Sequence, residues 1–168
     1  MNIPKIFNFD NPKLSEEFSK LTSLQRSMID RWNKPVKIND YSCYTRQTGV
    51  TTAMLFDASF HALLNKTNIF VLSPTHKTSI ILSECFINTF EHKNILSMFK
   101  KEYVEFKTGG RLMFTSCNNF GNKIRGHSIN RIYIDRKSEC ELPLDFYESV
   151  LPAFDWEKSS KIIMTDTR

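Results

Sequence analysis

Residues 43–52 read CYTRQTGVTT, a segment whose residue types could surround a phosphate group. A phosphate loop of the Walker A type follows the pattern G-x-x-x-x-G-K-[S/T], and its backbone N–H groups wrap the phosphates just before a helix begins. Gly49 and Thr51 occupy the second glycine and the hydroxyl position, whereas Tyr44 and Val50 replace the first glycine and the lysine. By pattern alone the match is poor, and a capped helix start is the commoner explanation of a lone G-x-T-T.

A second candidate is Asp135, which ends the apolar segment RIYID at residues 131–135. In P-loop enzymes an acidic residue at the end of a buried strand (Walker B) holds Mg²⁺, and a neighbouring glutamate commonly activates the attacking water. Here the next residue is Arg136. The alternative interpretation is that Asp135 only ends the strand and caps the next turn.

The surrounding sequence predicts the elements that would position these residues. Helical spacing of apolar residues predicts helices at 15–32, 52–64, 77–90, 95–100 and 144–151. Short apolar runs predict strands at 40–44, 68–72, 131–135 and 161–164, and alternation on either side of two glycines predicts a hairpin of 103–106 with 111–114.

Strands that alternate with helices predict an α/β fold, with a mostly parallel sheet flanked by helices on both faces. Ligands of such sheets bind at the carboxyl ends of the strands. Residues 45–52, Asp135 and residues 165–167 all fall at that edge. The three candidate segments are therefore expected to lie close together.

Composition favours one globular domain over residues 1–168. The chain is 40% hydrophobic, and it is long enough to bury a core. Its four cysteines form no CxxC pair and no cluster of metal-ligand spacing, which favours reduced thiols and a cytoplasmic location. No apolar run approaches the roughly 20 residues that cross a bilayer, so we expect no membrane partner. The net charge of +5 favours an anionic partner such as a nucleotide or a nucleic acid.

In their order along the chain, these motifs resemble the ATPase domain of the large terminase subunit, the motor that packages DNA into the heads of tailed bacteriophages. The resemblance extends over about residues 24–167. It rests on the segments LQR (24–26), CYTRQTGVTT (43–52), SPT (73–75), IRGHS (124–128), IYID (132–135) and KIIMTDT (161–167).

The resemblance implies a P-loop NTPase-like fold that binds ATP and Mg²⁺, and it assigns roles by position. The implied ATP-binding residues are Gln25, at the adenine-recognising position, and Arg46, Gln47, Thr48, Gly49, Val50, Thr51 and Thr52 of the loop. Thr51 and Asp135 are the implied Mg²⁺ ligands, and the implied catalytic residues are Asp135, Arg46 and Arg125. The implied coupling motif, which links hydrolysis to DNA movement, is Thr165, Asp166 and Thr167.

Two departures fall on the catalytic positions of this family. Val50 stands where the family has a lysine, which removes a charge-assisted contact to phosphate. Arg136 stands where the family has the catalytic glutamate, whose water-orienting role is worth on the order of 10² to 10⁴ in rate. Rescue would need Arg46 as the cation and Glu139 or Glu141 as the base. We therefore expect a terminase-like DNA-packaging ATPase module that binds ATP and Mg²⁺ but hydrolyses ATP weakly or not at all.

Two other functions stay open, namely an active ATP-hydrolysing motor fragment that uses Arg46 and a non-enzymatic interaction protein that modulates the phage terminase. The resemblance implies double-stranded DNA, terminase or portal components, or further copies of the chain as partners, and the host cytoplasm as location. Large terminase subunits continue into a nuclease domain after the coupling motif. Because this sequence ends at Arg168, we expect a domain truncated at its C-terminus and without nuclease activity.

Overall fold

The structure is a computed structural model that describes residues 16, 18–34, 39–89, 95–154 and 160–167. Seven strands form one sheet in the order β1-β7-β6-β2-β5-β4-β3. Their bounds are β1 Asn39–Tyr44, β2 Asn68–Ser73, β3 Leu96–Lys100, β4 Tyr103–Phe106, β5 Arg111–Ser116, β6 Ile129–Ile134 and β7 Lys161–Thr167. The five neighbouring strands β1, β7, β6, β2 and β5 are parallel, and β4 and β3 add an antiparallel edge. The predicted mostly parallel sheet is confirmed.

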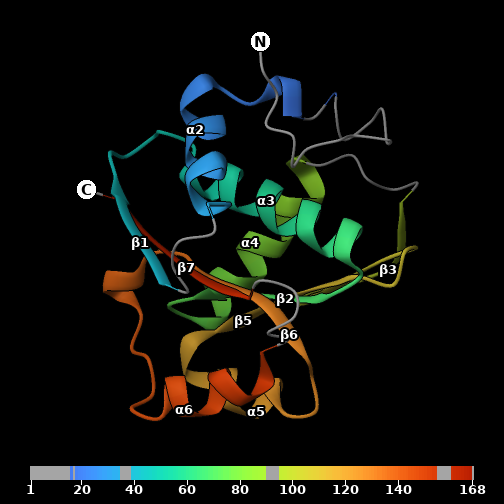
Figure 1. Cartoon of the computed structure of the whole chain (residues 1–168), viewed down its shortest axis with the longest axis vertical. Coiled ribbons are helices and arrows are strands. Elements are labelled where there is room, and N and C mark those ends of the chain that lie inside the picture. Colours follow the sequence, from blue (N-terminus) through green and yellow to red (C-terminus); the bar gives the residue numbers. More distant parts are fainter. Residues whose placement is uncertain (1–15, 17, 35–38, 90–94, 155–159, 168) are drawn as a thin grey trace.

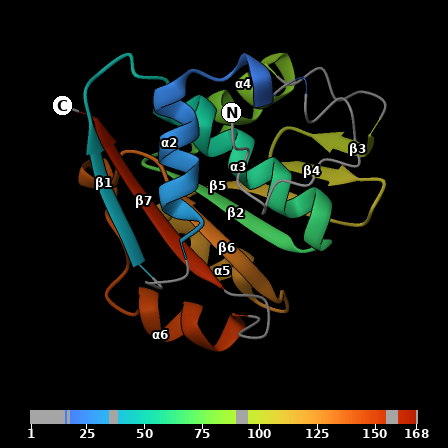
Figure 2. The same ribbon diagram turned by 45° about the horizontal axis from the view of Figure 1, so that its top comes forward.

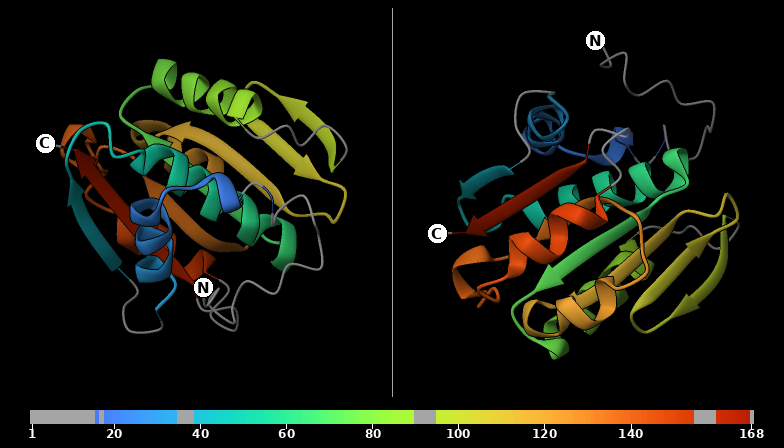
Figure 3. Two further views of the ribbon diagram at one scale, coloured as in Figure 1. Left: turned by 90° about the horizontal axis from the view of Figure 1, so that it is seen from above. Right: turned by 60° about the horizontal axis from the view of Figure 1, so that its bottom comes forward.

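Helices cover both faces of the sheet, as the sequence predicts (Figures 1 and 3). On one face lie α2 (Ser23–Trp32), α3 (Val50–Asn65) and α4 (His76–Thr89), and on the other lie α5 (Phe120–Ile124) and α6 (Phe146–Val150). Two apolar clusters fill the two interfaces. Residues 53–63 of α3 are all buried, and most of them are apolar, as is typical of a helix that is enclosed on all sides. None of the described helices is long and apolar enough to cross a membrane.

The prediction of a helix at 95–100 is wrong, because this segment is strand β3. It pairs with β4 in an antiparallel hairpin, with Leu96 opposite Phe106 and Lys100 opposite Tyr103. A short apolar run has no periodicity that separates a helix from a strand, so the partner strand decides.

The single helix predicted at 15–32 is interrupted before α2. Thr22 has extended backbone angles and caps the new helix, and its side chain accepts a hydrogen bond from the N–H of Gln25. The Gln25 side chain accepts one from the N–H of Thr22 in return, which completes a capping box. The helix predicted at 144–151 is also shorter, because α6 passes into the 3-10 turn η3 (Leu151–Ala153). Parts of the predictions at 15–32 and 77–90 lie outside the described residues.

Strand β7 is longer than the predicted 161–164 and runs between β1 and β6 (Figure 2). Its last residues, 165–167, pair with Ser42, Cys43 and Tyr44 of β1. The predicted coupling motif is therefore part of the sheet, directly beside the strand that leads into the loop at 45–49.

A cluster of buried polar side chains joins α2, α3 and β6. Asp57 of α3 accepts hydrogen bonds from two β6 side chains, the hydroxyl of Tyr133 at 2.7 Å and Nη1 of Arg131 at 3.3 Å. Asn33, which follows α2, donates to Asp57 Oδ1 at 2.8 Å and accepts from Arg131 Nη2 at 2.9 Å. His61 Nε2 lies 2.7 Å from the Asn33 side-chain oxygen. These contacts fix the direction of α3 across the sheet.

The charges in this cluster compensate one another. Burial acts to raise the pKa of Asp57, but the neighbouring His61, Arg131 and Tyr133 outweigh it and lower the pKa to about 2. Burial and the charge of Arg131 lower the pKa of His61, against the opposing effect of Asp57. Asp57 and Arg131 thus form a buried ion pair, in which each charge compensates the other.

We predict that Asp57→Asn lowers the free energy of unfolding by about 3 kcal/mol, because it leaves the Arg131 guanidinium buried without a negative partner. Urea denaturation measures the difference. Glu84→Gln is the matched control, since Glu84 is exposed on α4, and it should change the free energy by less than about 0.5 kcal/mol. A loss below about 1 kcal/mol for Asp57→Asn would mean that the pair is not needed for stability.

Candidate functional site

The loop at residues 45–49 connects β1 to α3 at the carboxyl edge of the sheet. Gln47 and Gly49 both have left-handed backbone angles, with φ of +64° and +72°, and Gly49 is the residue that precedes α3. The first N–H groups of any helix have no partner within the helix, and together with the helix dipole they favour an anion. Residues 45–51 therefore have the backbone shape of an anion-binding loop.

Gln25 of α2 holds this loop in place. Its Nε2 donates to the carbonyl of Gly49 at 3.1 Å, while its Oε1 accepts from the N–H of Thr22 at 2.8 Å. A Cβ at position 49 would lie 2.3 Å from Gln25 Nε2, so only glycine allows this close approach as well as the positive φ. The sequence predicts Gln25 as an adenine contact, and the structure gives it a positioning role that the sequence did not reveal.

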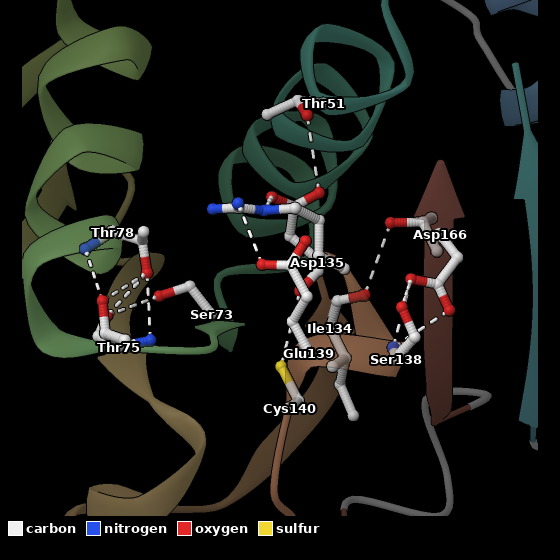
Figure 4. Close-up of polar contacts among 12 residues, drawn as sticks. Thr51, Ser73, Thr75, Thr78, Ile134, Asp135, Ser138, Glu139, Cys140 and Asp166 are labelled. Atoms are coloured by element: carbon white, nitrogen blue, oxygen red, sulfur yellow. Dashed lines mark hydrogen bonds and ion pairs between the residues drawn. The ribbon is translucent and has the colours of Figure 1, made fainter. Parts of the chain in front are cut away.

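Thr51 and Asp135 meet across the space between α3 and β6 (Figure 4). The Thr51 hydroxyl donates to Asp135 Oδ1 at 3.4 Å, and the Asp135 N–H donates to the carbonyl of Leu72 on β2 at 2.9 Å. Asp135 is only 4% exposed. Burial raises the pKa of its carboxyl group, against the opposing effects of Arg136 and Thr51. The two predicted Mg²⁺ ligands are thus brought together.

Arg136 turns back toward Asp135. Its backbone is left-handed, with φ of +51°, and its Nε lies 3.7 Å from Asp135 Oδ2. Its Nη1 forms an ion pair of 3.1 Å with Oε2 of Glu139. Both candidate substitutes for the missing base are exposed, and Glu139 is bound to Arg136 at this site, whereas no contact ties Glu141 to it among the described residues.

Val50, at the family's lysine position, and Arg46, the candidate substitute cation, differ in their burial. Val50 is 4% exposed and packs in the apolar cluster on the α3 face of the sheet, so the lysine position contributes to the core. Arg46 is exposed at the loop, and it forms no ion pair or hydrogen bond within the described part of the chain. Gln47, Thr48 and Thr52 lie in the same loop and first helical turn, where the Thr48 hydroxyl donates to the carbonyl of Thr45 at 2.9 Å.

The segment at 73–75 also lies at this edge and starts α4. Thr75 and Thr78 cap the helix reciprocally, since each N–H donates to the hydroxyl of the other residue. Ser73 donates to the carbonyl of Thr75 at 3.0 Å (Figure 4).

The prediction that Arg125 joins the catalytic residues is not supported by its position. Arg125 follows α5 and precedes the first residue of β6, whereas Asp135 follows the last. The six residues of β6 place these ends roughly 16 Å apart. Arg125 instead lines a separate cavity of about 550 Å³, together with His127 and Asp145. The sequence order of the motifs could not show that α5 returns the chain to the opposite edge.

The coupling motif contacts the turn that follows Asp135. Asp166 accepts hydrogen bonds from the N–H and the hydroxyl of Ser138, at 3.0 and 2.7 Å, and from the Tyr41 hydroxyl at 2.9 Å. Burial acts to raise the pKa of Asp166, but these hydrogen bonds outweigh it and lower the pKa. The Thr165 hydroxyl donates to the carbonyl of Ile134 at 3.4 Å, and Thr167 pairs with Tyr44 through the backbone. No sequence pattern indicated Ser138 or Tyr41.

The residues present fit a nucleotide with Mg²⁺ in part. The hydroxyl of Thr51 and the carboxylate of Asp135 are ligand types that Mg²⁺ prefers, and Mg²⁺ commonly uses only one or two protein groups beside the phosphates. No group of three or more ligating side chains occurs among the described residues. The described residues support hydrolysis less well. Val50 stands at the position of the lysine, and the carboxylate of Glu139, beside Asp135, is paired with Arg136.

We predict that Gln25→Glu destabilises the loop at 45–49 while leaving the capping box intact. The carboxylate still accepts from Thr22 but cannot donate to the carbonyl of Gly49, which costs about 1 kcal/mol. Thermal unfolding and amide hydrogen exchange of residues 47–51 report the change. Arg26→Gln on the same helix is not suitable as a control, because Arg26 donates to the carbonyl of Ser19. Leu24→Met, an exposed position of α2, is the better one. Equal exchange rates in Gln25→Glu and the wild type would contradict the positioning role.

Several solved structures share this fold. The ATPase domain of the large terminase of Thermus phage P74-26 matches with a TM-score of 0.67 and 15% identity, over 91% of this chain and 68% of that one. The large terminase of bacteriophage HK97 matches with a TM-score of 0.71 and 13% identity, over 89% and 33%. A large terminase from a thermophilic bacteriophage matches with a TM-score of 0.63 and 14% identity, over 87% and 39%. The chain thus spans about a third of the HK97 protein and two thirds of the P74-26 domain.

At these identities the likeness shows the fold alone. No curated protein matches the chain. Residues 44–168, which run from the end of β1 through β7, match the family described as "Terminase large subunit, T4likevirus-type, N-terminal". The chain therefore belongs to the family of N-terminal domains of T4-type large terminase subunits.

Proposed function

We propose that this domain binds a nucleoside triphosphate, ATP in the first place, at the loop of residues 45–51 and hydrolyses it slowly or not at all. The observation that carries the proposal is the contact of Thr51 with Asp135 at the end of a left-handed loop. A hydroxyl at the second helical residue and a buried carboxylate at the end of the neighbouring strand are the pair that P-loop proteins place beside the phosphates.

The phosphates would meet the N–H groups at the start of α3, with Arg46 free to approach them from the loop. Thr51 and Asp135 are the residues that would hold Mg²⁺. When bound, the ion would neutralise part of the phosphate charge. The carbonyl of Gly49 accepts from the N–H of Ala53 at 3.0 Å, as the first hydrogen bond of α3, and from Gln25 Nε2 at 3.1 Å, so Gln25 ties the end of the loop to α2.

Slow hydrolysis follows from two side chains. Val50 is packed in the core, so the lysine that would contact the terminal phosphate has no equivalent. Arg136 replaces the water-orienting glutamate and engages Glu139, the nearest substitute. The lysine would contact phosphate both in the bound ATP and in the transition state, whereas the glutamate acts in the transition state, so we expect turnover to be lost to a greater extent than binding.

In the virus, we propose a role in DNA packaging, where the domain takes part through nucleotide-dependent contacts with double-stranded DNA or with terminase and portal components. Family membership and the net charge of +5 support this role. The contacts of Asp166 with Ser138 and Tyr41 support a mechanical link between the nucleotide site and strand β1. An active motor that uses Arg46, and a partner protein that leaves the nucleotide site empty, are the alternatives that the next two experiments separate.

Calorimetry should detect ATP binding by the full chain with Mg²⁺ present. We predict that Thr51→Val weakens binding about tenfold, because it removes a hydroxyl in the first turn of α3 that would donate directly to a phosphate oxygen, with or without Mg²⁺. Thr108→Val, in the exposed turn between β4 and β5, is the matched control and should bind as the wild type does. If millimolar ATP gives no heat of binding, the partner-protein alternative is favoured and the proposal fails.

Steady-state hydrolysis should be at background for the wild type, with and without double-stranded DNA. The double variant Val50→Lys with Arg136→Glu restores the cation and the base, and we predict a rise of at least about 10² over the wild type. Val50→Lys alone also tests the fold, because its side chain must leave the core, so a melting temperature is measured beside each rate. Clear wild-type turnover that Arg46→Ala abolishes would instead establish the active-motor alternative.

A further inference from the structure

The guanidinium of Arg136 lies between two carboxylates at the candidate site. Its Nε is 3.7 Å from Asp135 Oδ2, and its Nη1 is 3.1 Å from Glu139 Oε2. The Arg136 side chain is 35% exposed, against 56% for Glu139, so it lies over the site rather than out in solvent. It is therefore a fixed positive charge beside the carboxylate that would hold a metal ion.

Both oxygens of Asp135 already face a donor. Oδ1 accepts from Thr51 at 3.4 Å, and Oδ2 faces Arg136. A divalent cation that approached this carboxylate would have to displace the guanidinium or bear its repulsion, because like charges at contact distance disfavour each other. Asp135 is thus less available to Mg²⁺ than the same residue would be beside a glutamate.

The backbone holds Arg136 in this orientation. A φ of +51° is uncommon for a residue other than glycine, and such conformations persist where surrounding contacts determine them. Here the Arg136 carbonyl accepts from the N–H of Glu139 at 3.0 Å, and the N–H of Ser138 is bound by Asp166. The turn η2 (Lys137–Glu139) is therefore held by its own backbone hydrogen bond and by Asp166 at its middle residue, which fixes the backbone from which the Arg136 side chain projects.

The guanidinium retains donors for a phosphate. It carries five N–H groups in a planar fork, which suits phosphate oxygens. Nε and Nη1 face the two carboxylates, whereas Nη2 has no hydrogen-bond or ion-pair partner among the residues that the structure describes. One side chain can thus neutralise Asp135 and contact a phosphate at once, which are two tasks that Mg²⁺ performs in P-loop proteins.

We infer that Arg136 serves as a built-in cation at the nucleotide site, so that ATP binding by this domain depends only weakly on Mg²⁺. The inference rests on the proposed function, since it concerns the same site. Arg136 is here a ligand-binding residue and not merely the residue left where a catalytic glutamate is lost. Arginine at position 136 thus has two effects. It leaves the site without a water-orienting glutamate, and it supplies the positive charge that Mg²⁺ would otherwise bring to ATP binding.

The test is calorimetric titration of the full chain with ATP in two buffers of equal ionic strength, one with Mg²⁺ and one with EDTA. The two dissociation constants of the wild type should agree within about threefold, whereas Arg136→Gln should bind at least about tenfold more weakly in EDTA than in Mg²⁺. Lys107→Gln removes the same charge from an exposed turn and should keep the wild-type ratio. Circular dichroism checks that each variant is folded.

The possible results are distinct. If the wild type binds ATP more than about tenfold tighter with Mg²⁺, the inference is wrong while the proposed function stands. If Arg136→Gln keeps the wild-type ratio, a group other than Arg136 replaces the metal, and the inference is again wrong. If the wild type binds ATP in neither buffer, the proposed function fails and the inference falls with it. If Arg136→Gln does not fold, the ratio of the wild-type dissociation constants in EDTA and in Mg²⁺ decides whether the inference holds.

Discussion

Helix α3 is fixed to strand β6 by two carboxylates, and the remaining geometry of the site depends on this. Asp57 of α3 contacts Arg131 and Tyr133 of β6, and Asp135, which directly follows β6, contacts Thr51 in the first turn of α3. A buried carboxylate is costly unless charge or hydrogen bonds compensate it, so neither contact tolerates much displacement. The direction of α3 across the sheet, and with it the shape of the loop before it, is thereby determined.

The loop at residues 45–49 therefore keeps its shape without the lysine and the glutamate that catalyse hydrolysis in P-loop enzymes. Its conformation depends on Gly49, on the hydrogen bond from Gln25 and on the packing of α3, and none of these needs a lysine at position 50. Binding and hydrolysis are separable in such a site, because backbone N–H groups and cations contact phosphate in the ground state, whereas the water-orienting base acts only in the transition state. Val50 stabilises the core at the place where a lysine would serve catalysis.

Much of the fold could be predicted from the sequence, because the apolar runs of β2, β6 and β7 and the helical spacing of α3 and α4 are strong local signals. The edge at which residues 45–52 and Asp135 meet followed from the rule for parallel sheets. The sequence of strand β3 does not distinguish a helix from a strand, because pairing with β4 determines its conformation. The capping-box spacing of Thr22 and Gln25 does indicate the start of α2 at Ser23.

The contacts that define the site could not be predicted, because they join residues far apart in the chain. Asp57 and Arg131 are 74 positions apart, and Gln25 and Gly49 are 24 apart. At position 136 the sequence shows only that a glutamate is absent. The position of the guanidinium is known only from the structure, because it depends on the left-handed backbone of Arg136. Arg125 shows the opposite case, in which motif order alone indicated a residue that the topology carries to the far edge.

The most direct measurement of the central claim is phosphorus-31 NMR of ATP mixed with a stoichiometric amount of the full chain and Mg²⁺, followed over hours. Binding without turnover predicts β- and γ-phosphate resonances that are shifted or broadened relative to free ATP, with no growth of ADP or inorganic phosphate above the protein-free control. Unchanged ATP resonances would contradict nucleotide binding. Stoichiometric conversion to ADP and phosphate would contradict the claim that a site with Val50 and Arg136 at these positions does not hydrolyse ATP effectively.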